Sequence, residues 1–77
     1  MNPPLTLDEH RELGSEMKRS VERLRTLCDL VVEVYGPQKR AAFSFMKAME
    51  ALDRLCQDLE TQATQDLPGH TEQKLYL

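Results

Sequence analysis

Metal binding and nucleophilic catalysis need histidine or cysteine close to other reactive side chains, and this sequence has two residues of each type. His10 lies near its start and His70 near its end, and neither belongs to the Cys-x-x-Cys or His-Glu-x-x-His spacing of zinc sites. Cys28 and Cys56 have no histidine beside them in the sequence, so neither is placed to act as an activated thiolate. These residues predict no metal, no cofactor and no catalytic nucleophile.

Carboxylates form two short motifs, Asp8-Glu9-x-x-Glu12 and Glu50-x-x-Asp53. Carboxylates three residues apart on a helix share a face and can hold a hard cation. The two motifs resemble the acidic motifs of the all-α nucleoside triphosphate pyrophosphatases, and the resemblance implies Mg²⁺-dependent nucleotide hydrolysis. The hairpin described below separates Asp53 from Glu12 by more than a helical turn and directs these acids outward. We therefore expect a protein that is not an enzyme.

The 77 residues form one domain (1–77), and a chain of this length buries only about 60% of its unfolded surface. Such small scaffolds usually gain stability from disulfides, a metal or oligomerisation. Apolar residues at 40% and charged residues at 30% are typical of a folded protein. The three glycines, Gly14, Gly36 and Gly69, are far apart, which favours long helices over short strands.

The surroundings of the chain are predicted from its charge and its apolar runs. The net charge of −3 gives no strong attraction to nucleic acid or acidic lipid. The first residues lack the pattern of a signal peptide, and the longest apolar run, at 30–32, is too short to cross a bilayer. We expect a cytoplasmic protein with no membrane partner, in which Cys28 and Cys56 are reduced, buried thiols.

Apolar residues at helical spacing predict a first helix over 6–35. Thr6 and Glu9 have the spacing of a capping box at its start. His10 falls on a heptad d position at the end away from the turn, where we expect a partly hydrated residue. Apart from Gly14, the other a and d positions carry Leu7, Met17, Val21, Leu24, Cys28, Val31 and Tyr35.

Gly36-Pro37 predicts the turn, because glycine suits the residue after a helix and proline suits the first turn of the next one. We predict an all-α fold, a two-helix antiparallel hairpin with an N-terminal extension (1–5) and a C-terminal tail (68–77). One long kinked coiled coil is the alternative. It would place glycine and proline inside a helix, where they cost about 1 and 3 kcal/mol relative to alanine. The second helix, over 38–67, carries Ala42, Phe45, Met49, Leu52, Cys56, Leu59 and Ala63 at the same spacing.

Six of the eight g positions beside this seam are also apolar, and they occur on both helices. A third apolar position is what a four-helix bundle buries. A large side chain left in water there forgoes about 1.5–3 kcal/mol. We therefore predict a homodimer, a four-helix bundle of parallel or antiparallel hairpins, that acts as a non-catalytic interaction or regulatory module; its partner is a second copy or another helical protein. The predicted interface consists of Leu13, Leu27, Val34, Ala48 and Leu55.

Near the turn, apolar residues also lie outside the core stripe. They are Leu30, Val32, Phe43 and Met46. This surface predicts either a docking patch for a partner protein or the rim of the dimer interface. The last apolar residues, 75–77, are a short docking motif, a segment that folds back on the helices, or a disordered end of the chain.

Basic residues near the middle of both helices give the alternative function, a nucleic-acid-binding hairpin dimer. A basic belt doubled in a dimer could contact phosphates. The architecture is similar to that of the plasmid copy-control hairpins that dimerise and bind RNA. Acidic residues interrupt the belt, and charges at helical spacing, such as Arg25 and Asp29, favour a solvated, paired face. The belt consists of Lys18, Arg19, Arg23, Arg25, Lys47 and Arg54.

Overall fold

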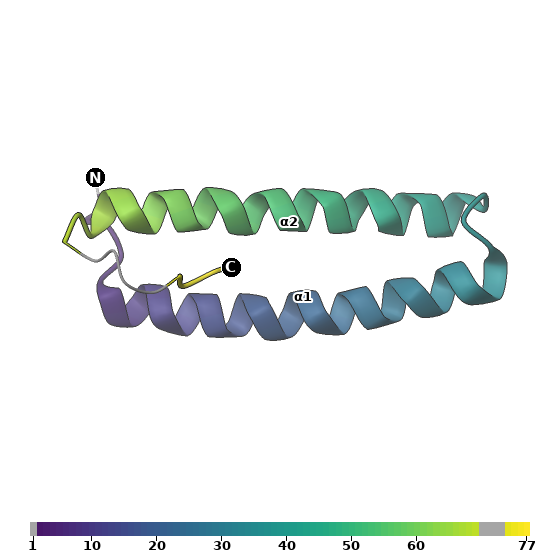
Figure 1. Cartoon of the computed structure of the whole chain (residues 1–77), viewed down its shortest axis with the longest axis horizontal. Coiled ribbons are helices and arrows are strands. Elements are labelled where there is room, and N and C mark those ends of the chain that lie inside the picture. Colours follow the sequence, from purple (N-terminus) through teal and green to yellow (C-terminus); the bar gives the residue numbers. More distant parts are fainter. Residues whose placement is uncertain (1, 70–73) are drawn as a thin grey trace.

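The computed structural model describes residues 2–69 and 74–77, and these form two long helices joined by a tight turn (Figure 1). Helix α1 spans Leu7–Tyr35 and helix α2 spans Arg40–Asp66. The helices run antiparallel and pack against each other, so the predicted all-α hairpin is confirmed and a single kinked coil is excluded. The molecule measures 46 × 21 × 20 Å. Within the described residues, neither helix is long and apolar enough to span a bilayer.

The start of α1 is fixed by the predicted capping box. The Thr6 hydroxyl accepts a hydrogen bond from the backbone N–H of Glu9 at 3.2 Å. The Glu9 carboxylate in turn accepts one from the backbone N–H of Thr6 at 2.9 Å. Each side chain thereby satisfies a backbone donor that the first turn of a helix leaves free. Thr6 is the cap, so α1 begins one residue later than expected.

The turn depends on Gly36, whose φ of 85° lies in the region that favours glycine. Its N–H donates to the carbonyl oxygen of Val32 at 2.8 Å and closes α1. Pro37 was expected in the first turn of the second helix but lies in the connecting turn. Lys39 is the N-cap, so α2 begins at Arg40, two residues later than expected.

The seam between the helices follows the heptad spacing. Ala42, Met49, Cys56 and Ala63 are buried at intervals of seven residues along α2. Among the described residues, the helices themselves supply one large buried apolar side chain, Met49, while the others are alanine or cysteine. A seam of such small side chains gives only a thin core.

Two further seam residues bear on the predictions. Both cysteines, Cys28 and Cys56, are buried and free, as predicted. His10 was expected to be partly hydrated, and that prediction is wrong, because the residue is 0% exposed. It is buried because the end of the chain covers it.

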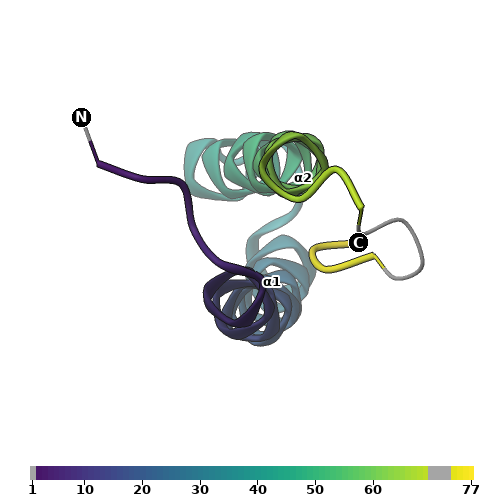
Figure 2. The same ribbon diagram turned by 90° about the vertical axis from the view of Figure 1, so that its left-hand side faces the viewer.

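The C-terminal residues return along the hairpin and lie beside both helices near the end opposite the turn, which we call the open end (Figures 1 and 2). Leu75 and Tyr76 are buried there together with Cys56 and Ala63. Of the three alternatives for this tail, the structure therefore shows the segment folded back on the helices. The tail acts as a third element that completes the core at one end only.

Candidate functional site

The tail lies in a groove between α1 and α2 at the open end, which we call the tail groove. Gly14 makes the room for it, since a Cβ atom at this position would overlap the carbonyl oxygen of Leu75. Several half-buried side chains of both helices complete the apolar lining around Leu75 and Tyr76. These are Leu7, Leu13, Met17, Val21 and Leu59.

A buried chain of polar contacts holds the Tyr76 ring. His10 Nδ1 lies 2.7 Å from the Tyr76 hydroxyl, and His10 Nε2 lies 3.0 Å from Asp66 Oδ2. An ionised carboxylate only accepts, so Nε2 carries a hydrogen and donates it to Asp66. In the neutral imidazole, Nδ1 then accepts from the tyrosine hydroxyl. The three groups therefore satisfy one another across α1, α2 and the tail.

Glu60 holds the backbone of the tail. Its Oε1 atom accepts from the N–H of Leu75 at 2.8 Å and from the N–H of Tyr76 at 3.1 Å. Hydrogen bonds to a charged acceptor are stronger than those between neutral groups. One half-buried carboxylate on α2 thus replaces the water that an extended segment would otherwise bind.

The pKa values of the site agree with a closed binding network. The hydrogen bond from His10, followed by that from Gln62, lowers the pKa of Asp66 from its ordinary value of 3.8. Burial, reinforced by the charges of Glu60 and Asp66, raises the pKa of Tyr76 above its ordinary 10.0. Asp66 is therefore held charged and the Tyr76 hydroxyl is held neutral.

An Asp–His–hydroxyl chain is also the geometry of a proton relay, so the Tyr76 hydroxyl must be judged as a nucleophile. Such a group needs a lowered pKa or a base that draws off its proton at a site open to substrate. The pKa of Tyr76 is raised, and the residue is 2% exposed. The arrangement is suited to holding a side chain, not to attacking a substrate.

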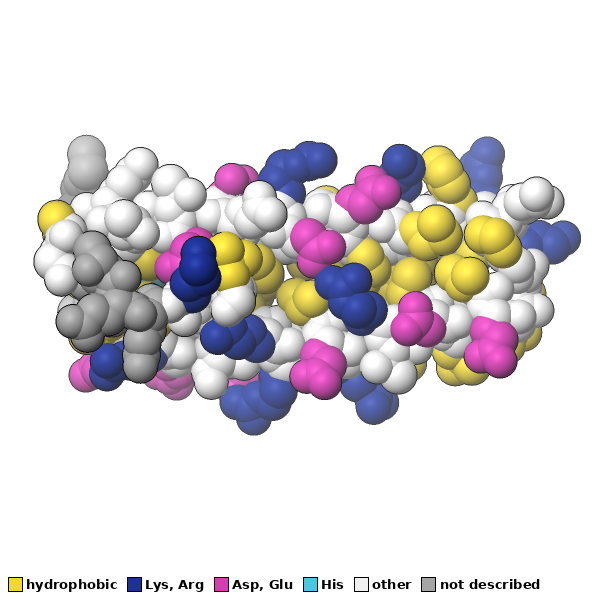
Figure 3. Space-filling model, viewed as in Figure 1, with side chains coloured by type: hydrophobic (Ala, Val, Ile, Leu, Met, Phe, Trp, Pro, Cys, Tyr) yellow, Lys and Arg dark blue, Asp and Glu magenta, His cyan; other side chains and the backbone are white. Residues whose placement is uncertain are grey.

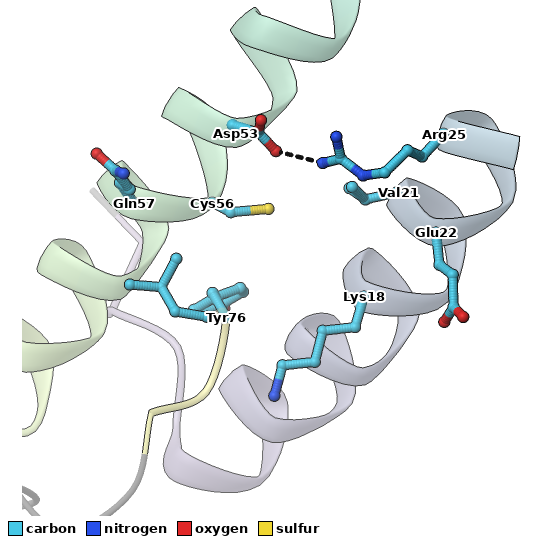
Figure 4. A pocket seen from close by; sticks show the side chains of 9 residues that line it. Lys18, Val21, Glu22, Arg25, Asp53, Cys56, Gln57 and Tyr76 are labelled. Carbon is cyan, nitrogen blue, oxygen red and sulfur yellow. Dashed lines mark hydrogen bonds and ion pairs between the residues drawn. The ribbon is translucent and has the colours of Figure 1, made fainter. Parts of the chain in front are cut away.

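The groove continues beyond the tail as a hollow of about 450 Å³. Figure 4 shows the Cys56 thiol pointing into it above the ring of Tyr76, with Lys18 on α1 at its lower edge. Arg25 on α1 and Asp53 on α2 form an ion pair at 2.8 Å that bridges the two helices (Figure 4). The hollow combines an apolar floor with a charged rim.

The acidic motifs do not come together. Asp8 lies 3.9 Å from Arg11, and Glu9 is occupied by the capping box. On α2, Glu50 pairs with Lys47 at 3.4 Å. Within residues 2–69 and 74–77, no three histidine, cysteine, aspartate or glutamate side chains form a group that could hold a metal ion.

Half of the basic belt is neutralised by neighbouring carboxylates. Arg19 pairs with Glu16 at 2.9 Å, and Lys47 pairs with Glu50. Arg25 was expected to pair along its own helix with Asp29, but it reaches across to α2 and pairs with Asp53. A phosphate backbone would have to displace these partners.

The five predicted interface residues differ in exposure. Leu13 is half-buried and packs against the tail core, while Leu27 is half-buried nearer the turn. Val34 is 62% exposed and Leu55 is 41% exposed, and Ala48 is exposed as well. Three of the five are therefore exposed, and the other two are partly covered.

Leu27 and the three exposed members lie on the side of the hairpin opposite the tail groove. At about 100° per residue, Leu27 and Val34 are close to half a turn around α1 from Gly14. On α2 the same step separates Leu55 from Glu60. We call the surface of Leu27, Val34, Ala48 and Leu55 the lateral face.

At the turn, apolar side chains are exposed in several directions, and Figure 3 shows hydrophobic atoms gathered over the first turns of α2. Leu30 and Phe43 are each more than half exposed, and the Lys47 ammonium lies 5.4 Å from the centre of the Phe43 ring. Met46 is 38% exposed, whereas Val32 is half-buried. We call the exposed surface of Leu30, Tyr35, Phe43 and Met46 the turn-end patch.

Comparison with protein-family models, curated proteins and solved structures finds no match for this chain. Its function is therefore inferred from these surfaces.

The sequence patterns did not identify the tail groove, which depends on His10, Gly14, Glu60, Asp66 and Tyr76. Two signals point to it: a glycine at a core position, and an apolar triplet in a polar tail.

Proposed function

We propose that the protein is a non-catalytic helical interaction module that pairs with a second copy through the lateral face to form a four-helix bundle. The observation that carries the proposal is the exposure of Val34 and Leu55 on the side that the tail leaves open. On the other side, the chain covers its own groove. The tail groove and the lateral face thus flank the same apolar seam, but only the tail groove is covered by the chain itself.

The exposed area of the molecule supports association. The surface is 6026 Å², whereas a compact monomer of 8.9 kDa exposes about 4,800 Å². The radius of gyration is 15.4 Å, against about 11.5 Å for a compact chain of this length. Pairing two elongated hairpins side by side reduces this excess and buries apolar side chains that now contact water.

The identity of the exposed residues supports a helical partner. Val34 and Leu55 continue the heptad pattern, so a second hairpin can present a matching stripe. The free, buried cysteines suit a reducing compartment, which accords with the cytoplasm that the sequence predicts. Of the turn-end patch, Leu30 lies next to this face on α1, whereas Met46 lies half a turn around α2 from Leu55, on the side of the tail groove.

Charge placed on the lateral face tests the proposal. Replacing Leu27 and Leu55 by glutamate should convert a dimer to a monomer, because two carboxylates per chain would be buried without partners. Size-exclusion chromatography with light scattering gives the mass, and circular dichroism checks that the helices persist. The matched control replaces Thr26 and Thr61 by glutamate, adding the same charge on the outward face.

The control variant should keep the mass of the unmodified protein. If the Leu27 and Leu55 variant loses its helices, Val34→Lys replaces it, since a 62% exposed side chain contributes little to a lone hairpin. Unchanged dimer mass in these lateral-face variants would contradict the proposed interface.

The nucleic-acid alternative is tested with the same material. Binding to structured RNA or duplex DNA at low salt should weaken strongly when Arg19 and Arg23 are changed to glutamate. The ion pairs of Arg19 and Arg25 favour the interaction module over this alternative. Binding that is strong and sensitive to Arg23 would reverse that preference.

A further inference from the structure

The tail groove has the parts of a peptide-binding site. Glu60 binds two consecutive backbone N–H groups, and His10 binds the hydroxyl of the tyrosine that follows. Gly14 gives the backbone of the bound segment close access to α1. These contacts recognise an extended segment with an apolar residue followed by tyrosine, whichever chain carries it.

The segment that fills the site belongs to the same chain and follows α2 in the sequence. Asp66 at the end of α2 and Tyr76 in the tail both bond to the same imidazole, that of His10. The ten residues from one to the other can span about 33 Å when extended. That length exceeds the separation between two side chains bound to one imidazole, so the covalent link is long enough to reach beyond its own groove.

We propose that the tail groove accepts the tail of a second copy of this chain, so that two hairpins can exchange their C-terminal segments. The second copy carries the one sequence that the structure shows seated in this site. Exchange of an identical element forms the same contacts in the pair as in the single chain, so it needs no new chemistry. The contact uses the side of the hairpin opposite the lateral face and does not depend on the proposed function.

Exchange competes with docking of the chain's own tail. The covalent link holds the chain's own tail at an effective concentration of about millimolar, so intramolecular docking dominates in dilute solution. Exchange gains at high local concentration, or when one of two chains has an unusable tail or groove. The second condition provides the test.

The experiment mixes two full-length variants, each also carrying Leu55→Glu to remove the lateral contact. One has Gly14→Ala, which blocks the groove and leaves the tail intact. The other has Leu75→Asp and Tyr76→Ala, which leaves the groove open and the tail unusable. We expect the mixture to form a heterodimer by native mass spectrometry, while each variant alone stays at the mass of one chain.

A labelled peptide of residues 70–77 gives an independent readout. It should bind the open-groove variant at least about tenfold more tightly than the unmodified protein, whose own tail competes. The Gly14→Ala variant should not bind it. Absence of a heterodimer overturns the proposed tail exchange, whether the peptide binds or not. Failure of the lateral-face test alone does not affect the proposed exchange.

Discussion

The open end and the turn end of the hairpin bury their apolar side chains to different extents. At the open end Tyr76 is 2% exposed and is held between both helices. At the turn end Tyr35 is 61% exposed, and Leu30 and Phe43 are also exposed. Both ends are built from the same heptad pattern, so the difference comes from the tail, which reaches only one of them.

The comparison shows how little two helices can enclose. Apart from Met49, the buried apolar residues that the helices contribute, among those described, are alanine and cysteine. A third element supplies large side chains and encloses polar groups such as His10. At the turn end no segment of the described chain does this, so a second copy is the natural source of cover.

The largest expected effect separates the two tyrosines. Tyr76→Ala removes a buried ring and leaves His10 without its hydroxyl partner, so we expect a loss of about 3 kcal/mol in the free energy of unfolding. Tyr35→Ala should change it by less than about 0.5 kcal/mol. Urea denaturation at one fixed protein concentration gives both values. Equal losses would remove the distinction between the two ends.

Gly14→Ala sharpens the comparison through the sign of its effect. With the tail docked, the added methyl group meets the Leu75 carbonyl, and we expect the free energy of unfolding to fall by about 2 kcal/mol. With Leu75→Asp and Tyr76→Ala already present, the same change should stabilise α1 by up to about 1 kcal/mol. Ser15→Ala, on the exposed side of the same turn, serves as the control. If Gly14→Ala lowers stability both with the intact tail and with the altered tail, the methyl group does not act through the tail.

Glu60 provides a smaller effect. Glu60→Ala leaves the N–H groups of Leu75 and Tyr76 without their acceptor, and we expect the free energy of unfolding to fall by about 1.5 kcal/mol. The matched change nearer the turn on α2, Glu50→Ala, removes only an exposed pair with Lys47 and should lower the free energy of unfolding by less than about 0.5 kcal/mol. Thermal unfolding of the two variants side by side measures the difference. A larger loss from Glu50→Ala would contradict the account.

The smallest expected effect is the pH dependence of tail docking. The pKa of Asp66 is lowered in the folded chain, so the unfolded chain binds more protons as the pH falls below 3.8, and stability declines there. The pKa of Tyr76 is raised, so stability also declines as the pH rises past 10.0, where the unfolded tyrosine ionises first. In a plot of the free energy of unfolding against pH, Asp66→Asn should reduce the decline at acid pH, and Tyr76→Phe should reduce the decline at alkaline pH. If neither decline changes, these groups have the same pKa in the folded and the unfolded chain.

The helices, the capping box and the turn were predictable because each depends on residues close together in the chain. Thr6 with Glu9, and Gly36 within its turn, signal structure locally. The tail groove is not local, since Tyr76 bonds to a residue 66 positions away. Heptad spacing placed His10 in the seam but could not show that a distant segment would cover it.

The site also contains residues to which the sequence patterns assigned no role. Gly14 falls on a heptad core position without a side chain, and Glu60 is one of thirteen aspartate and glutamate residues. Their roles depend on where the backbone of the tail passes, which sequence spacing does not specify. A glycine at a heptad core position, together with an unplaced apolar triplet, is the combination to look for in similar small hairpins.

Sedimentation equilibrium of the unmodified chain, from low micromolar to submillimolar concentration, tests most directly whether the uncovered apolar surface is an association surface. We predict a mass that rises with concentration toward twice the 8.9 kDa of one chain. A mass that stays at 8.9 kDa over the whole range, with the helices intact, would contradict the account.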